Sequence, residues 1–342
     1  MKYKILFFLF IPLFAFASSE AAENVDLFNR DNAGFFVSGE FLYWTVSEGA
    51  LDYALRMRSP AWGSTDSFAQ GDFERAEFSW DPGYRFVLGY YRAPNFWMAD
   101  FDWTYIHFKN HDQAKRPPKN ENRFMTGTWP HIFSAPMEHA TSDIHLHYEL
   151  ANLLAHRVFF PINNPHLRMK LFGGLTGVWI HQGWKVRYFD FERNNTMINN
   201  HWKYWGFGFR GGLSFDWFWG RDIYVTGKCS GALVLGHYKN HAKQETNVVL
   251  NPGDNPAVPL RDARYTDYRS SFTAQLLLGP SYQKSFAKWR LEIFVGYEMT
   301  IWTNLQEVFR STRSPADQAK ETWLNNSLIA IHGLSTRASF NF

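Results

Sequence analysis

Residues with large apolar side chains alternate with polar or small residues over long stretches of this chain. In residues 76–91 the even positions are mostly aromatic or aliphatic, whereas the odd positions include Glu77 and Arg85. The clearest further examples are 205–217 and 289–301, and weaker ones are 34–46, 96–108, 166–180, 223–238, 265–282 and the C-terminal segment. Successive side chains of a strand point to opposite faces, so this pattern predicts β-strands.

The length of these segments predicts where the apolar face points. The segments run for about 13–17 residues, whereas strands of water-soluble proteins average five or six. A strand that crosses a membrane needs about 9–11 residues. A strand from Trp205 to Trp217 is about 40 Å long. At a tilt near 40° it spans about 30 Å along the membrane normal, which is close to the separation of the two aromatic girdles on either side of an apolar band. The apolar face is therefore predicted to face lipid.

Short and long connections alternate along the chain. The short ones are 92–95, 161–165, 219–222 and 284–288, and the long polar ones are 47–73, 109–141, 182–201, 239–264 and 303–322. Short periplasmic turns and long extracellular loops are typical of outer-membrane barrels. Counting strands between the connections predicts an all-β fold, a transmembrane antiparallel barrel of ten strands. Twelve strands result if residues 51–56 belong to another hairpin.

The alternation is irregular in residues 142–157. Ile144, Leu146 and Tyr148 share one parity, whereas Leu153 and Ala155 share the other. A bulge near 150–152 would shift the parity by one residue. We therefore expect a β-bulge at this position.

Composition excludes several classes of protein. Aromatic residues make up 19% of the 342 residues, hydrophobic residues 45%, and the mean hydropathy is −0.36. So many aromatic residues argue against disorder, and beyond the first 17 positions no apolar run is long enough for a membrane helix. The 35 basic and 32 acidic residues give a net charge of +3, which is too balanced for a nucleic-acid-binding protein. The single cysteine, Cys229, excludes an internal disulfide and cysteine-ligated metals.

The N-terminus has the pattern of a secretory signal peptide. Lys2 and Lys4 precede an apolar run from Ile5 to Phe16, and Ala15 and Ala17 form an A-x-A cleavage site. We therefore expect a signal peptide at 1–17, a periplasmic segment at 18–33 and a barrel at 34–342.

Six stretches resemble a known family in their order along the chain. They are 34–44, 51–55, 82–90, 167–182, 205–219 and 296–302. In this order they are similar to the pore-forming major outer membrane proteins of Legionella and of Chlamydia-related bacteria. The resemblance implies a porin-like role. The chain departs from the family at 151–157, where both acids of the usual Leu-Asp-Leu-Glu-Leu-Gly-Arg motif are replaced, which puts the family's ion preference in doubt here.

Two sequence motifs have structural explanations that we favour over a ligand site. Gly206-x-Gly208-x-x-Gly211 matches a dinucleotide-binding fingerprint, but that motif needs a helix after it, and here the strand pattern continues. His145, His147 and Glu149 share one strand face and could bind zinc, but no fourth ligand is identifiable, so we interpret the histidines as wall residues near the outer rim. No metal or cofactor is expected.

Two carboxylates raise the possibility of an enzyme. Asp100 and Asp102 lie on one strand face and, with His145 or His147, could activate a water molecule for hydrolysis. This alternative resembles the ten-stranded outer-membrane proteases. Both aspartates fall within the predicted strand and not at its outer rim, so we favour a charged lumen wall.

The inward face is predicted to be hydrated and charged. The expected pore-lining residues are Glu77, Arg85, Asp100, Asp102, Arg210, Asp216, Lys228, Arg290, Glu292, Glu298 and Arg337. Ten or twelve strands make a narrow lumen, so glycines on this face, such as Gly89, Gly208 and Gly296, are expected to make room. Because charges of both signs occur, weak ion selectivity is predicted.

The outward face is predicted to contact lipid and to carry the assembly signal. The expected aromatic girdle is Trp80, Trp97, Trp103, Trp205, Trp217 and Trp289. Phe342, with Phe340, ends the chain as barrels in general do, which implies recognition by the barrel assembly machinery. The expected partners are outer-membrane lipid, this machinery and, as a possibility, further copies of the chain, but not nucleic acid.

Three functions follow from the sequence. The favoured one is passive diffusion of small polar solutes or ions through the lumen. The alternatives are a structural or adhesive surface barrel, if paired charges close the lumen, and an outer-membrane hydrolase.

Overall fold

The computed structural model describes residues 33–57, 71–92, 97–118, 124–129, 137–161, 166–220, 222–248, 258–286, 289–311 and 322–342. The predicted signal peptide and nearly all of the predicted periplasmic segment lie outside these residues. The described residues include no helix long and apolar enough to cross a membrane.

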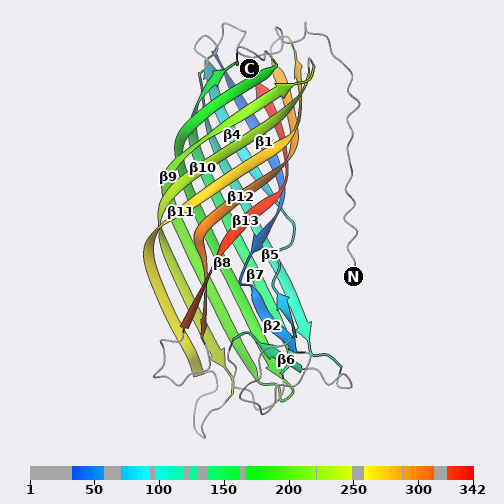
Figure 1. Ribbon diagram of the computed structural model, residues 1–342, viewed down its shortest axis with the longest axis vertical. Helices are drawn as coiled ribbons and strands as arrows, with labels where there is room; N and C mark the ends of the chain where they lie inside the picture. The colour runs from blue at the N-terminus through cyan, green and yellow to red at the C-terminus, as the bar shows by residue number, and fades with distance from the viewer. Residues whose placement is uncertain are drawn as a thin grey trace.

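Ten of the described strands form a closed antiparallel barrel (Figure 1). They are β1 (Ala33–Glu48), β4 (Asp81–Arg92), β5 (Trp97–Lys115), β7 (Met137–Phe159), β8 (Leu167–Asp190), β9 (Asn195–Phe218), β10 (Ile223–Thr246), β11 (Val258–Ser285), β12 (Arg290–Ser311) and β13 (Thr322–Asn341). The barrel closes because β1 pairs with both β4 and β13. The predicted all-β fold with ten antiparallel barrel strands is confirmed.

A small second sheet lies at one end of the barrel (Figure 1). It consists of β2 (Asp52–Met57), β3 (Gly71–Arg75) and β6 (Phe124–Gly127), in the order β3-β2-β6. β2 includes residues 52–56 of the segment that would have raised the strand number to twelve, but within the described residues it pairs only with β3 and β6. We call this end of the barrel the loop end, and the opposite end, where β1 begins and β13 ends, the terminus end.

The barrel strands are longer than predicted. β8 and β9 have 24 residues each and β11 has 28, about twice what a membrane crossing requires. Residues 182–201, predicted as a long loop, are mostly strand, with a turn at 191–194. That prediction is wrong because Trp184 and Tyr188 alternate with Lys185 and Arg187, so the same period of two continues beyond the expected membrane boundary.

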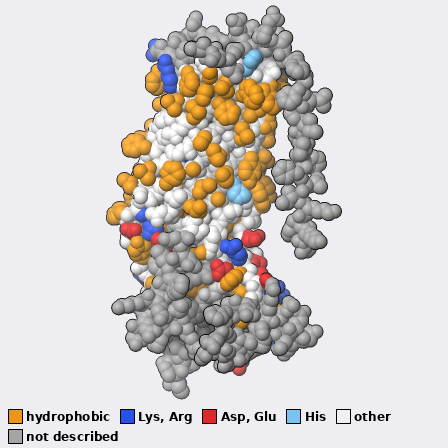
Figure 2. All heavy atoms as spheres, viewed as in Figure 1, with side chains coloured by type: hydrophobic (Ala, Val, Ile, Leu, Met, Phe, Trp, Pro, Cys, Tyr) orange, Lys and Arg blue, Asp and Glu red, His pale blue; other side chains and the backbone are white. Residues whose placement is uncertain are grey.

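Large hydrophobic side chains point outward over much of the barrel. Phe209 is 76% exposed and Leu235 68%. Figure 2 shows that hydrophobic side chains spread over the barrel wall, whereas charged side chains gather toward the loop end. An apolar surface of this extent is rare on a water-soluble monomer. We call this surface the apolar band.

The polarity of the two strand faces is reversed toward the loop end. The outward side chains of β8 run in that direction from apolar to basic: Leu171, Leu175, Trp179, His181, Lys185, Arg187. The inward ones run from charged to apolar: Arg168, Lys170, Val178, Ile180, Trp184, Tyr188. Near the loop end the barrel therefore has the apolar interior and polar surface of a water-soluble protein.

The same reversal explains the irregular alternation in β7. The even residues from Ala140 to Val158 are all buried, so the parity of the strand does not change. β7 pairs with β8 without a register shift at 150–152, and the described irregularity lies between Met137 and His139. The predicted bulge near 150–152 is therefore wrong: the sequence changes there because the outward face passes from Leu153 to Glu149 while the backbone remains regular.

Candidate functional site

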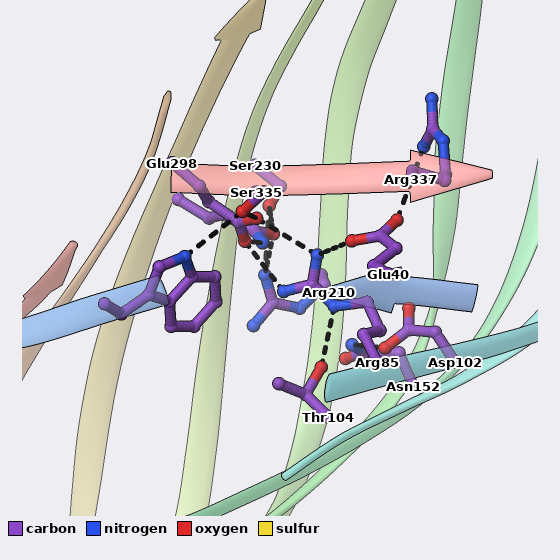
Figure 3. Close-up of polar contacts among 12 residues, drawn as sticks. Glu40, Arg85, Asp102, Thr104, Asn152, Arg210, Ser230, Glu298, Ser335 and Arg337 are labelled. Atoms are coloured by element: carbon purple, nitrogen blue, oxygen red, sulfur yellow. Dashed lines mark hydrogen bonds and ion pairs between the residues drawn. The ribbon is translucent and has the colours of Figure 1, made fainter. Parts of the chain in front are cut away.

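A buried ionic cluster crosses the barrel interior around Arg85 (Figure 3). Arg85 on β4 donates through Nη1 to Glu40 Oε2 on β1 at 2.7 Å and through Nη2 to Glu298 Oε1 on β12 at 2.8 Å. Its Nε donates to Thr104 Oγ1 on β5 at 2.7 Å. Glu40 is the direct cross-strand partner of Arg85, whereas Glu298 reaches it from three strands away. The guanidinium therefore links distant strands.

Polar side chains from further strands complete this cluster. Arg210 Nη1 on β9 donates to Ser230 Oγ and to Gln275 Oε1, both at 3.0 Å. Gln275 in turn donates to Glu298. Ser335 Oγ on β13 donates to the other Glu298 oxygen at 3.1 Å. We call Glu40, Arg85, Arg210, Gln275 and Glu298 the charged cluster; its internal hydrogen bonds offset part of the cost of burying these charges.

A polar cavity lies on the terminus side of the charged cluster. It has a volume of about 160 Å³, and its lining includes Asp102, Lys170, Asp216, Lys228, Glu292 and Arg337. Asp216 accepts hydrogen bonds from Arg168 at 2.7 Å and from Thr226 at 2.9 Å, and Lys170 lies 3.1 Å away. Charges of both signs therefore face the cavity.

An apolar cluster occupies the interior on the loop side of the charged cluster. We call it the aromatic core, and its largest fully buried members are Leu42, Trp44, Tyr53, Phe108, Tyr148, Trp184, Tyr188, Tyr204, Tyr238 and Trp302. The rings of Tyr148 on β7 and Trp302 on β12 lie 6.3 Å apart, centroid to centroid. These two strands are five places apart in the ten-stranded barrel. The contact therefore spans its diameter.

The structure places ten of the eleven predicted pore-lining residues inside the barrel. They are Arg85, Asp100, Asp102, Arg210, Asp216, Lys228, Arg290, Glu292, Glu298 and Arg337. Their role in solute passage stays a prediction.

Glu77 is the exception, and its predicted position is wrong. Residues 76–80 precede β4, and there Glu77 is exposed while Phe78 is buried against Phe108. The parity changes before Asp81, because the strand begins there and not at residue 76.

The hydrolytic arrangement considered from the sequence is not formed. Asp100 and Asp102 are buried on the inward face of β5, whereas His145 and His147 are on the outward face of β7. Asp100 instead contacts His156 at 2.6 Å, and Asp102 accepts a hydrogen bond from Asn152 at 2.8 Å. His147 contacts Glu149 at 2.8 Å. The acids and the histidines of the proposed site are thus separated by the barrel wall.

The inward glycines do not widen the lumen as expected. The position of a Cβ at Gly89 lies 2.1 Å from the Phe36 ring, and that at Gly296 lies 2.2 Å from the Phe294 ring. At Gly208 the obstacle is the backbone oxygen of Leu233, at 1.9 Å. Neighbouring atoms fill the space, so these glycines permit close packing. Gly206 and Gly208 lie within β9, which continues to Phe218, so the dinucleotide motif lacks its helix.

No described group of three or more His, Cys, Asp or Glu side chains is arranged to hold a metal ion.

The predicted girdle residues are on the outside of the barrel wall. They are Trp80, Trp97, Trp103, Trp205, Trp217 and Trp289. Phe340 and Phe342 are exposed at the end of the chain. Their parts in membrane contact and assembly stay predictions.

The aromatic core is not among the features predicted from the sequence. Its signal is present in β8, where Val178, Ile180 and Trp184 alternate with His181 and Lys185. This is a strand pattern whose apolar residues are even-numbered, whereas the apolar residues Leu171 and Leu175 earlier in the strand are odd-numbered. The sequence prediction instead assigns residues 182–201 to a long polar loop.

The closed barrel, with an apolar exterior and charged interior, defines the protein as an integral outer-membrane β-barrel. The family described as Legionella pneumophila major outer membrane protein precursor matches residues 30–334. The chain belongs to this family, as its resemblance suggested, and its location is the bacterial outer membrane. None of the curated proteins matches the chain.

Three solved outer-membrane proteins are similar to the chain, each with 8% identity. The outer membrane protease OmpT from Escherichia coli has a TM-score of 0.39, with 90% of this chain and 96% of that chain covered. A Pseudomonas aeruginosa FadL homologue has a TM-score of 0.21, with 94% and 93% covered. The Pseudomonas putida toluene transporter TodX has a TM-score of 0.20, with 96% and 94% covered. At these TM-scores, none of the three bears on the activity of this chain.

Proposed function

We propose that the protein is a structural barrel of the outer membrane whose interior is closed to solutes by the aromatic core. The observation that carries this proposal is the contact of Tyr148 with Trp302 across the barrel diameter. Both side chains are buried, with 1% or less of each exposed. Burial of an aromatic side chain stabilises a protein by about 1.5–3 kcal/mol, so moving this core aside would be costly.

Polar contacts between distant strands support the same proposal. Gln182 Nε2 on β8 donates to Glu48 Oε1 on β1 at 3.0 Å, on the loop side of the charged cluster. Arg85 and Glu298 make a second connection. Eight-stranded barrels have interiors just filled by side chains, and water-filled porins have 16–18 strands, so ten strands lie near the filled limit.

A porin-like channel is the second candidate. It is favoured by the charged cavity on the terminus side, about 160 Å³ in volume, and by the resemblance to pore-forming proteins. In this case Tyr148 and Trp302 would have to separate to admit solutes. The hydrolytic site considered from the sequence is not formed, because the barrel wall separates Asp100 and Asp102 from His145 and His147.

Single-channel recording in a planar lipid bilayer separates the two candidates. We expect wild-type protein to give no conductance steps, and Tyr148→Ala/Trp302→Ala to give them, because truncation removes the contact across the interior. The control is Trp205→Ala/Phe209→Ala, which removes two outward rings and should conduct no better than wild type. Heat-modifiable gel mobility shows whether each variant is folded. Reproducible steps from wild-type protein would overturn the closed barrel and establish the channel.

A further inference from the structure

Two rows of imidazole and amine groups run across the outer surface of five adjacent strands. The first row, on β5, β7, β8, β9 and β10, is His107, His147, His181, Lys203 and Lys239. The second, on the same strands, is Lys109, His145, Gly183, His201 and His241. Successive members of each row are direct cross-strand partners, so their side chains point to the same side of the wall. We call these two series the basic rows.

The basic rows begin where the apolar band ends. Toward the loop end, His107 follows Tyr105 on the outward face of β5, His181 follows Trp179 on β8, and Lys203 follows Trp205 on β9. Figure 2 shows the same general order on the displayed face, with hydrophobic side chains followed toward the loop end by charged ones. In an outer-membrane barrel the loop end is extracellular, so the basic rows lie at the depth of the outer-leaflet headgroups.

The members of the rows are in close contact. The ring centroids of His107 and His147 are 5.8 Å apart, those of His145 and His181 5.8 Å, and those of His181 and His201 4.9 Å. Gly183 leaves room for one of these rings, because a Cβ there would lie 2.3 Å from His145 Cε1. The surface is therefore a continuous patch of nitrogen groups.

Acidic groups border the patch but do not enter the rows. Glu149 contacts His147 at 2.8 Å, and Asp262 contacts His241 at 2.8 Å. Beyond the apolar band, burial and the nearby His201 and Lys203 together lower the pKa of His181 to about 4. The His181 imidazole is therefore neutral at pH 7, so the lysines supply the positive charge of the rows, and neutral imidazoles can donate hydrogen bonds to an anion bound beside them.

We propose that the basic rows bind the phosphate groups of the phosphorylated glycolipid that forms the outer leaflet, while its acyl chains lie against the apolar band. Charge complementarity and continuity with the lipid-facing surface support this occupant. Lysine and arginine side chains near an anionic membrane surface strengthen binding to it. The assignment concerns the outer wall, so it stands whether the interior is closed or open.

Native mass spectrometry of the detergent-solubilised protein tests this proposal. The lipids are diphosphoryl, monophosphoryl and fully dephosphorylated lipid A, with EDTA present to remove bridging metals. We expect wild-type affinity to decrease with each phosphate removed. Equal binding of the dephosphorylated lipid would overturn the proposal, and this comparison needs no variant.

Two matched variants locate the site. Lys203→Gln/Lys239→Gln should bind diphosphoryl lipid A about tenfold or more weakly than wild type. Arg92→Gln/Lys284→Gln removes the same charge from exposed positions at the terminus end and should bind as wild type does. His181→Gln/His201→Gln tests the imidazoles separately. Heat-modifiable mobility checks folding, and equal loss in the lysine variant and its control would contradict the assignment.

Free phosphate provides the last comparison. Inorganic phosphate at the same concentration should not displace the lipid, because it lacks acyl chains to contact the apolar band. Displacement would mean that the rows bind phosphate itself and would overturn the lipid assignment.

Discussion

Arg85 is the residue that most clearly joins distant parts of the barrel. Its side chain is 8% exposed, and its guanidinium contacts carboxylates from β1 and β12. A buried ion pair contributes little net stability when both partners are present, but removing one partner leaves an uncompensated charge. The contribution of Arg85 to stability therefore depends on Glu40 and Glu298, whose buried carboxylates would remain without a cation if Arg85 were replaced.

Replacing Arg85 tests this dependence. Arg85→Gln should lower the free energy of unfolding by about 3–5 kcal/mol, because Glu40 and Glu298 lose their cation. Arg85→Gln/Glu298→Gln should recover part of this loss. Urea unfolding in lipid vesicles, followed by tryptophan fluorescence, measures the change.

An exposed pair serves as the control for Arg85. Arg264 lies 3.4 Å from Asp262 with most of its side chain in solvent. Arg264→Gln should change the free energy of unfolding by at most about 1 kcal/mol. Equal destabilisation by Arg85→Gln and Arg264→Gln would show that Arg85 is not part of a buried network.

The long strands are unusual because each of their two faces changes polarity along the length of the strand. On β9, Phe207 and Phe209 are on the outward face of the membrane part, and His201 and Lys203 are on the same face nearer the loop end. This order follows from the two solvents that a long strand meets, hydrocarbon and then water. The backbone needs no irregularity for the change, as the continuous pairing of β9 with β10 shows.

Close packing between β9 and β10 depends on Gly208. A Cβ at Gly208 would lie 1.9 Å from the Leu233 backbone oxygen, which cannot move without disturbing β10. Gly208→Ala should therefore lower the free energy of unfolding by about 1–3 kcal/mol. Gly39→Ala is the control, because nothing lies within 4 Å of its added Cβ. Urea unfolding compares them, and a Gly208→Ala protein as stable as Gly39→Ala would contradict the packing.

Sequence periodicity predicted the strands better than their ends. Residues 205–217 alternate strongly and lie within β9, and the interior positions of Arg210 and Asp216 followed from their parity. The inward position predicted for Glu77 was wrong because the alternation was extended across the start of β4. In β7 the predicted bulge was wrong, because the even residues from Ala140 to Val158 stay buried while the outward residues change from Leu153 to Glu149. Contacts between distant strands, such as Tyr148 with Trp302, depend on barrel closure and have no local signal.

The whole molecule is built as two regions on one set of strands. In the terminus part the apolar band surrounds a charged interior with a cavity of about 160 Å³. In the loop part a polar surface with the basic rows surrounds the aromatic core. A ten-stranded barrel can therefore be stable in the membrane and beyond it, and the interior changes character where the exterior does.

A spin-label scan along β8, in a Cys229→Ser background, tests this arrangement most directly. Collision with oxygen reports contact with lipid, and collision with a water-soluble nickel chelate reports contact with water. We predict high oxygen accessibility for a label at Leu171, high nickel accessibility at Arg187, and low accessibility to both reagents at Ile180 and Trp184. High nickel accessibility at Ile180 and Trp184 would contradict the closed, apolar interior, and high oxygen accessibility at Arg187 would contradict the reversal of the strand faces.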